Sequence, residues 1–212
     1  MKLMIAVPSL DFMHTEFVKS LVALTKYLSA DDVDHDVVIQ SGTLVYVARD
    51  NLAKKAAGED YTHVLWLDSD MVFGEELVDD LLFCGAPFVS GICHGRRPPH
   101  LSCLFRSLDP LDRYHAEEYP REPFEIAGSG FGCVLMETDV IRKMLKECGT
   151  CFMPTRRLGE DLAFCERCRI LGIRMMADPS VRIGHIGHIT IWPEDEDRYI
   201  DRIQGGRACL KK

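Results

Sequence analysis

Apolar runs of strand character alternate with helically spaced apolar residues over the first 67 residues, and this alternation constrains the fold more than any other feature. The runs are residues 3–9 (LMIAVPS), 36–41 (DVVIQS) and 64–67 (VLWL), and apolar residues recur at helical spacing in 17–28 and 44–57. Such strands, separated by helices, are typical of a parallel sheet covered on both faces. The pattern predicts an α/β fold.

Polar residues follow the first and third expected strands. Ser9 ends the first run, and Asp68 and Asp70 follow the third. Right-handed crossovers bring the carboxyl ends of parallel strands to one rim, where ligands bind in open sheets. The sequence therefore predicts a ligand site on this rim that includes these three side chains.

The rest of the chain continues the alternation, with one long interruption. Apolar spacing predicts helices at 74–85, 139–147 and 160–171 and strands at 87–93, 131–137 and 173–180. Residues 94–123 are rich in proline and poor in periodic apolar positions, which indicates a long loop. Asp11 is expected to cap the helix over 17–28. A length of 212 residues favours one domain, 1–212.

Composition excludes several classes of protein. A net charge of −8 opposes sequence-independent binding of nucleic acid. No apolar segment approaches the ~20 residues that span a bilayer, and the N-terminus (MKLMIAVPSLDF) turns polar too early for a signal peptide. Nine cysteines, an odd count, favour reduced thiols over a disulfide framework. We therefore expect a cytoplasmic protein.

The carboxylate pair in 63–77 (HVLWLDSDMVFGEEL) has two interpretations from the residues alone. This stretch contains no lysine or arginine, and Asp68 and Asp70 are spaced so that both point to one side of an extended chain. Either they end the strand and cap the next helix, or a cation lies between them. A hard divalent cation is commonly held by one or two carboxylates and a substrate diphosphate.

A different chemistry fits the same letters. Asp68, Asp70 and Val72 match the DxDx[TV] pattern of haloacid-dehalogenase-like phosphatases, in which Asp68 would be the nucleophile and Asp70 an acid/base. That motif normally follows the first strand, and this chain has no later Gly-Asp-x-x-x-Asp cluster. The phosphatase is therefore the weaker hypothesis.

The order of several short motifs resembles GT-A glycosyltransferases, particularly inverting, family 2-like bacterial and phage members. The motifs are IAVPS, VARDNLAKKA, LWLDSDM, GSGFGCVLM, GEDLAFCERCRILGI and DPSVRIGHIG. The resemblance implies a Rossmann-like, mostly parallel mixed sheet with helices on both faces, and transfer of a sugar from a nucleotide sugar, UDP-linked by family habit. It implies a donor half, 1–93, and an acceptor half, 124–192. The acceptor class stays open: glycan, lipid, protein or modified nucleotide.

The resemblance also implies a metal site. Asp70 would bind Mn²⁺ or Mg²⁺ directly, and Asp68 would contact the ribose or the water shell of the metal. A late histidine would complete the set, and His185 in IGHIG matches the family pattern better than His188. An imidazole ligand favours manganese over magnesium.

Asp161, in the ED motif, would by resemblance be the general base that accepts the proton of the acceptor hydroxyl, with Glu160 in reserve. Alternatively, the acidic pair has only a structural role, because acidic residues in a first helical turn interact favourably with the helix dipole. Attack opposite the diphosphate would invert the anomeric carbon, although the DxD motif also serves retaining enzymes.

Other positions have smaller implied roles in donor binding. Pro8 and Ser9 would line the base or ribose, and Arg49 and Asn51 would orient the nucleotide. Gly130, with Gly128 and Gly132, would let the backbone approach the sugar. Trp192 would offer a stacking face or simply pack.

The cysteines support a rival hypothesis. Cys148-x-x-Cys151 and Cys165-x-x-Cys168 have nearly the spacing of a four-thiolate zinc site. The second pair falls on the expected helix 160–171, where small buried residues are also expected. A zinc-stiffened scaffold, or a module that binds a nucleotide sugar without turnover, is the alternative to an enzyme.

Overall fold

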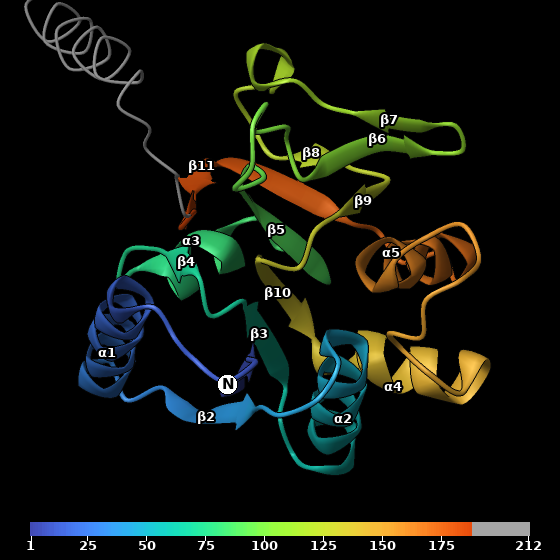
Figure 1. The fold of residues 1–212 in the computed structure, drawn as a ribbon. Coiled ribbons are helices and arrows are strands. Elements are labelled where there is room, and N and C mark those ends of the chain that lie inside the picture. The colour runs from blue at the N-terminus through green and yellow to red at the C-terminus, as the bar shows by residue number, and fades with distance from the viewer. Residues whose placement is uncertain (188–212) are drawn as a thin grey trace, which may run out of the picture.

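A seven-stranded mixed sheet forms the centre of the computed structural model, which describes residues 1–187. Two candidates, His188 and Trp192, lie outside the described residues. The sheet has the order β2-β1-β3-β10-β5-β11-β8 (Figure 1). Its strands are β1 (Lys2–Pro8), β2 (Asp34–Gln40), β3 (His63–Leu67), β5 (Phe88–Ile92), β8 (Phe124–Glu125), β10 (Cys133–Glu137) and β11 (Met176–Arg182).

Five of these seven strands run in one direction. β1 is parallel to β2 and β3, and β5 is parallel to β11. β10, in the middle of the sheet, is antiparallel to both of its neighbours, β3 and β5. The predicted α/β class with a mostly parallel mixed sheet is confirmed.

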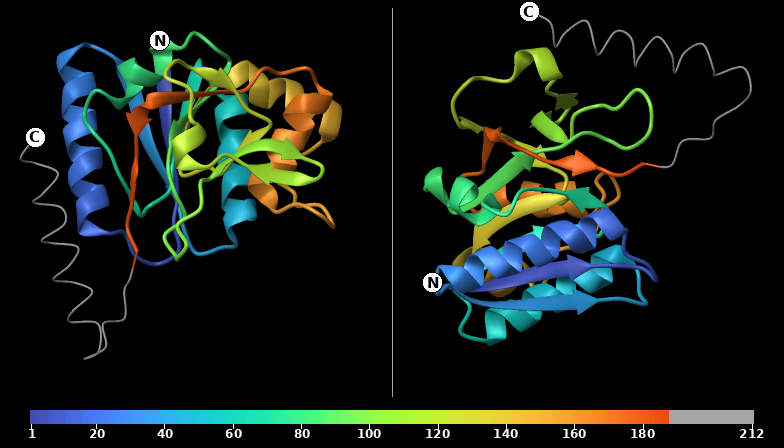
Figure 2. Two further views of the ribbon diagram at one scale, coloured as in Figure 1. Left: turned by 90° about the horizontal axis from the view of Figure 1, so that it is seen from above. Right: turned by 90° about the vertical axis from the view of Figure 1, so that its left-hand side faces the viewer.

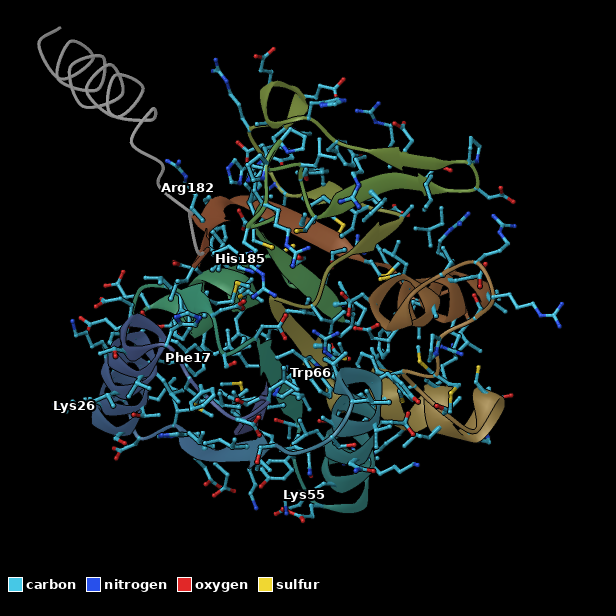
Figure 3. The ribbon with its side chains drawn as sticks, viewed as in Figure 1. Phe17, Lys26, Lys55, Trp66, Arg182 and His185 are labelled. Carbon is cyan, nitrogen blue, oxygen red and sulfur yellow. The ribbon has the colours of Figure 1, made fainter. Side chains whose placement is uncertain are left out.

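Helices cover both faces of the sheet, as Figures 1 and 2 show. They are α1 (Thr15–Ala30), α2 (Val45–Gly58), α3 (Leu77–Phe83), α4 (Thr138–Cys148) and α5 (Glu160–Ile170). Apolar residues of α1 and α3 form one core with one face of the sheet, and those of α2, α4 and α5 form a second core with the other face. Phe17 and Trp66 mark these two cores in Figure 3. Within residues 1–187, no helix combines the length and apolar character needed to cross a bilayer.

Phe131 is the centre of an aromatic cluster beneath the rim. Its ring centroid lies 4.9 Å from those of Phe152 and Phe164, 5.9 Å from Phe88 and 6.0 Å from Trp66. Burial of a side chain of this size contributes about 1.5–3 kcal/mol, and each edge-to-face contact adds about 0.5–1.5 kcal/mol. This cluster fixes the backbone on both sides of residue 131.

The expected loop at 94–123 contains regular structure. β6 (Leu104–Leu108) and β7 (Leu111–Arg113) form a hairpin, and β9 (Gly128–Ser129) extends it to three strands. A 3-10 turn follows at Ala116–Glu118. The loop expectation was wrong for these residues because Leu104, Phe105 and Leu108 are buried against the second core. In Figure 1, the hairpin lies beyond β11, at the end of the sheet opposite β2.

Two smaller expectations also differ from the structure. The helix expected to begin after Asp11 begins at Thr15, and its N-cap is His14, without a side-chain cap. The last strand begins at Met176 rather than at residue 173.

Candidate active site

Asp70 and His185 meet because two short strands pair at the rim of the sheet. β4 (Met71–Val72) and β12 (Gly184–His185) are antiparallel, with His185 opposite Met71. The backbone N–H of Ile186 donates to the carbonyl of Asp70 over 2.9 Å. His185, labelled in Figure 3, has Nε2 3.3 Å from Oδ2 of Asp70. The carboxylate and the imidazole therefore face each other.

A second contact sets the tautomer of His185. Its Nδ1 lies 2.8 Å from the carbonyl oxygen of His94. A carbonyl only accepts, so Nδ1 carries a hydrogen and donates it. In the neutral ring, Nε2 then presents a lone pair toward the carboxylate, an arrangement that favours a proton or a cation between them. The hydrogen bond with Asp70 accordingly raises the pKa of His185.

Asp70 has a cationic partner from a distant part of the chain. The half-exposed Arg96, in the loop after β5, forms an ion pair with Asp70 Oδ2. Burial alone would raise the pKa of Asp70, but His185 and Arg96 lower it below its ordinary value. Residues 63–77 contain no lysine or arginine, so the basic partner of Asp70 comes from another part of the chain.

Arg49 supplies the partner of Asp68 and joins it to the ED motif. This α2 side chain is 2% exposed. Its Nη2 donates to Asp68 Oδ1 over 2.8 Å, and its Nη1 donates to Glu160 Oε1 over 3.1 Å and to Asp161 Oδ1. One guanidinium thus contacts three carboxylates, two of which come from the first turn of α5. The cluster keeps a net negative charge.

The excess of negative charge and the burial act on Asp161. Burial raises the pKa of Asp161 to about 6, although Arg49 opposes the rise. Burial also raises the pKa of Asp68 despite the same arginine. The three carboxylates hold the pKa of Arg49 above its ordinary value, so the guanidinium stays charged. Asp161 is therefore a carboxylate that takes up and releases a proton near pH 6.

One pocket lies at the carboxyl ends of β1 and β3. It contains the predicted residues Pro8, Ser9, Asp68 and Asp70. Arg96 also lines it, and the basic stretch 95–97 (GRR) indicates a possible phosphate contact. Sequence reasoning missed the other residues that line it: Leu10, Thr43, Val45, Ala48 and Ser69. The position after a strand was the signal for Ser9, Asp68 and Asp70, whereas loop residues such as Thr43 carried no such signal.

A second pocket lies beside the ED motif, which Arg49 contacts. It is lined by Cys103, Phe105, Arg113, Gly130, Gly159, Glu160, Asp161 and Leu162. A Cβ at Gly130 would lie 3.8 Å from Asp161 Oδ2, so glycine leaves the space beside this carboxylate open. Gly128 and Gly132 instead face side chains such as Leu108 and Met71. Asn51 is exposed on α2 and lines neither pocket.

The residues at the rim fit a hard divalent cation held by two protein ligands. Asp70 offers a carboxylate oxygen, and His185 offers a nitrogen whose ring is oriented by a carbonyl, the usual outer partner of a metal-binding histidine. Asp68 is bonded to Arg49 instead. No group of three or more His, Cys, Asp or Glu side chains in residues 1–187 has the spacing of a complete metal site. A substrate diphosphate would have to supply further ligands.

The four cysteines of the zinc hypothesis do not form a thiolate site. Cys151, Cys165 and Cys168 are buried, whereas Cys148 is exposed. Burial raises the pKa of Cys151 and of Cys165 to about 12. Among residues 1–187, no three or more His, Cys, Asp or Glu side chains are grouped so that they could hold a metal ion. The structure therefore favours the packing role of these cysteines.

Comparisons with known proteins identify the fold. No family model and no curated protein sequence matches the chain. The crystal structure of A197 from STIV is similar with a TM-score of 0.61 and 19% identity, over 89% of this chain and 87% of that one. The catalytic domain of Drosophila beta1,4-galactosyltransferase 7, in complex with xylobiose, is similar with a TM-score of 0.50 and 16% identity, over 92% and 78%. The chain therefore has the expected GT-A, Rossmann-like fold.

Proposed function

We propose that the protein is a glycosyltransferase that moves a sugar from a nucleotide sugar, preferentially a UDP-sugar, to an acceptor hydroxyl with inversion. The observation that carries the proposal is that Arg49 contacts residues of both pockets. It contacts Asp68 of the DxD motif, which lines the first pocket, and Asp161, which lines the second. A donor in the first pocket and an acceptor in the second would meet at this arginine.

The donor pocket would hold the nucleotide between residues of the 1–93 segment and Arg96. Pro8 and Ser9 line it, and the half-exposed Arg96, which also lines it, would be a cation for the diphosphate. Asp70 and His185 would hold Mn²⁺ or Mg²⁺. When bound, the metal would neutralise charge on the leaving nucleoside diphosphate. Asp68 would be positioned by Arg49 and face the ribose.

Asp161 would act as the general base. The acceptor hydroxyl would lie in the open space beside Gly130, and its proton would move to Asp161 Oδ2 as the oxygen attacks the anomeric carbon. A pKa of about 6 keeps this carboxylate ionised at neutral pH and still able to hold a proton. Glu160 would hold Arg49 in place through its own contact with the guanidinium.

The direct test is release of nucleoside diphosphate from a panel of nucleotide sugars with Mn²⁺. We expect the wild-type chain to release UDP and Asp161→Asn to be slower by roughly 10²–10⁴, the usual contribution of a general base. Glu147→Gln, on α4 and 49% exposed, is the control and should retain full activity. Full activity of Asp161→Asn would disprove the role of this residue.

The phosphatase alternative can be tested on the same purified protein, because it predicts a different product. A phosphatase would form a covalent aspartyl-phosphate on Asp68, which a fluoride analogue would trap. No observation in the structure favours this reaction, since Asp68 Oδ1 is bonded to Arg49 and the motif follows β3 rather than β1.

A further inference from the structure

Cys93 and Cys103 face each other across a short antiparallel pairing. His94 and Ser102 form an isolated antiparallel bridge. The N–H of Cys103 donates to the carbonyl of Cys93 over 3.1 Å, and that of Gly95 donates to Leu101 over 2.8 Å. The two cysteines are therefore the adjacent cross-strand pair. Residues opposite each other in an antiparallel pairing have Cα atoms about 4.5–5.5 Å apart, which is within the range of about 4.4–6.8 Å found in disulfides.

Both side chains point to the same glycine-containing segment, residues 130–132. A Cβ at Gly132 would lie 3.6 Å from Sγ of Cys93, and a Cβ at Gly130 would lie 3.9 Å from Sγ of Cys103. Both sulfur atoms therefore lie beside the 130–132 segment, which joins β9 to β10. Because Gly130 and Gly132 have no side chain, the space next to the two sulfur atoms stays open.

The two thiols differ in access and in acidity. Cys103 is half-buried and lines the second pocket, whereas Cys93 is buried. A hydrogen bond between the two side chains lowers the pKa of Cys103, and the same hydrogen bond together with burial raises the pKa of Cys93. An accessible thiol of lowered pKa beside a buried one is the arrangement of an attacking and a resolving cysteine.

We propose that Cys93 and Cys103 form a reversible disulfide by exchange with a small-molecule disulfide such as oxidised glutathione. The Cys103 thiolate attacks one glutathione sulfur, and the first glutathione leaves as a thiolate. Cys93 then loses its proton and attacks Cys103 Sγ, which releases the second glutathione. Two protein thiols are oxidised and one glutathione disulfide is reduced to two thiols, so atoms and electrons balance. The other described cysteines stay reduced.

The disulfide would join the two ends of the 94–102 segment. That segment carries Arg96, which pairs with Asp70, and His94, whose carbonyl holds His185. Oxidation would therefore restrict the part of the chain that contacts the rim. This effect does not depend on the proposed transferase activity, because it concerns the motion of the segment itself.

Mapping of thiols in the full chain tests the proposal. Reduced protein is equilibrated with excess oxidised glutathione, free thiols are alkylated, and digested peptides are analysed by mass spectrometry. We expect one cross-linked product, Cys93–Cys103, which excess reduced glutathione removes. Cys103→Ser should abolish it, whereas Cys84→Ser, a half-buried cysteine elsewhere, should retain it. A stable glutathione adduct on Cys103, a different cross-link, or no cross-link would overturn the proposal.

Two measurements on the same oxidised sample are independent of any variant. The melting temperature should rise by roughly 5 °C or more, because a cross-link restricts the unfolded chain. Amide hydrogen exchange in 94–102 should slow on oxidation and recover on reduction. Unchanged exchange in a sample with the mapped disulfide would refute the restriction of this segment.

Discussion

Arg49 balances three carboxylates from inside the protein. Its side chain is 2% exposed, and it lies with its guanidinium carbon 5.4 Å from the centre of the Phe131 ring. A buried ion pair adds little net stability, but removal of one partner leaves the others uncompensated. The ion pairs of Arg49 therefore add little net stability, but they fix the positions of Asp68 and Asp161, and the loss of Arg49 would leave these buried carboxylates without a cation.

Replacement of Arg49 should destabilise the fold strongly. We expect Arg49→Met to lower the free energy of unfolding by roughly 3 kcal/mol, because it removes the cation that the buried carboxylates share. Lys55→Met is the matched control on the same helix. Lys55 pairs with Glu59 and both are more than 40% exposed, so its loss should cost under about 1 kcal/mol. Urea denaturation compares the two, and equal losses would contradict the role assigned to Arg49.

The pH dependence of the reaction should follow Asp161. Only the ionised carboxylate accepts a proton, and burial raises its pKa to about 6. The rate should therefore fall as pH drops below about 6 and level off above it. Stability has the opposite sign: a raised carboxyl pKa contributes stability below the unfolded value of 3.8, and that contribution is lost as pH rises through about 6.

A pH-rate profile at saturating donor checks the first of these expectations. Asp161→Asn should show the residual rate without an inflection near pH 6. An unchanged inflection in this variant would assign the titration to another group.

At the scale of elements, short strands and loops bring the site together. β4 and β12 are two residues each, yet their pairing brings His185 to Asp70. Asp50 of α2 accepts hydrogen bonds from the backbone N–H groups of Cys151 and Phe152, and so ties this helix to the segment before α5. These contacts fix the position of Arg49 relative to the ED motif.

Two glycines at helix ends should respond oppositely to alanine. Gly149 ends α4 with φ of 73° and donates to the carbonyl of Leu145, so Gly149→Ala should cost about 1 kcal/mol. Gly58 is the last residue of α2 and has open space around its Cβ position, so Gly58→Ala should stabilise by about 0.5 kcal/mol. Denaturation midpoints measure both, and a neutral Gly149→Ala would show that the left-handed cap is not needed.

At the scale of the whole molecule, the two cores pack on opposite faces of one sheet, and both pockets lie at the rim of this sheet. One core packs α1 and α3 on the sheet, and the other packs α2, α4 and α5. The first pocket lies at the ends of β1 and β3, and Asp161 lies in the first turn of α5, a helix of the second core. Ligand binding at this rim should therefore stabilise the entire fold.

UDP and Mn²⁺ together should raise the melting temperature more than either alone. At a ligand concentration of about 100 Kd, binding adds about 2.7 kcal/mol, or roughly 5–10 °C for a chain of this size. Chelation of the metal should remove the cooperative part. Asp70→Asn should also remove it, whereas Glu147→Gln should keep it. A full shift in Asp70→Asn would refute Asp70 as a metal ligand.

The sequence by itself determined the fold class and the positions of the central residues along the chain. Apolar periodicity reports which residues of each segment are buried, so it predicted the central strands and the helices on both faces. It also predicted that Asp68 and Asp70 follow β3 and that Asp161 begins α5, although their chemical roles stay predictions.

Only the tertiary structure decided which side chains meet. Arg49 contacts Asp68, 19 positions away, and Asp161, 112 positions away, and neither spacing leaves a periodic signal. The same holds for Arg96 with Asp70, for Cys93 with Cys103, and for the hairpin that proline content concealed. Such contacts depend on how whole elements pack, because packing selects among many partners that are equally compatible with local sequence.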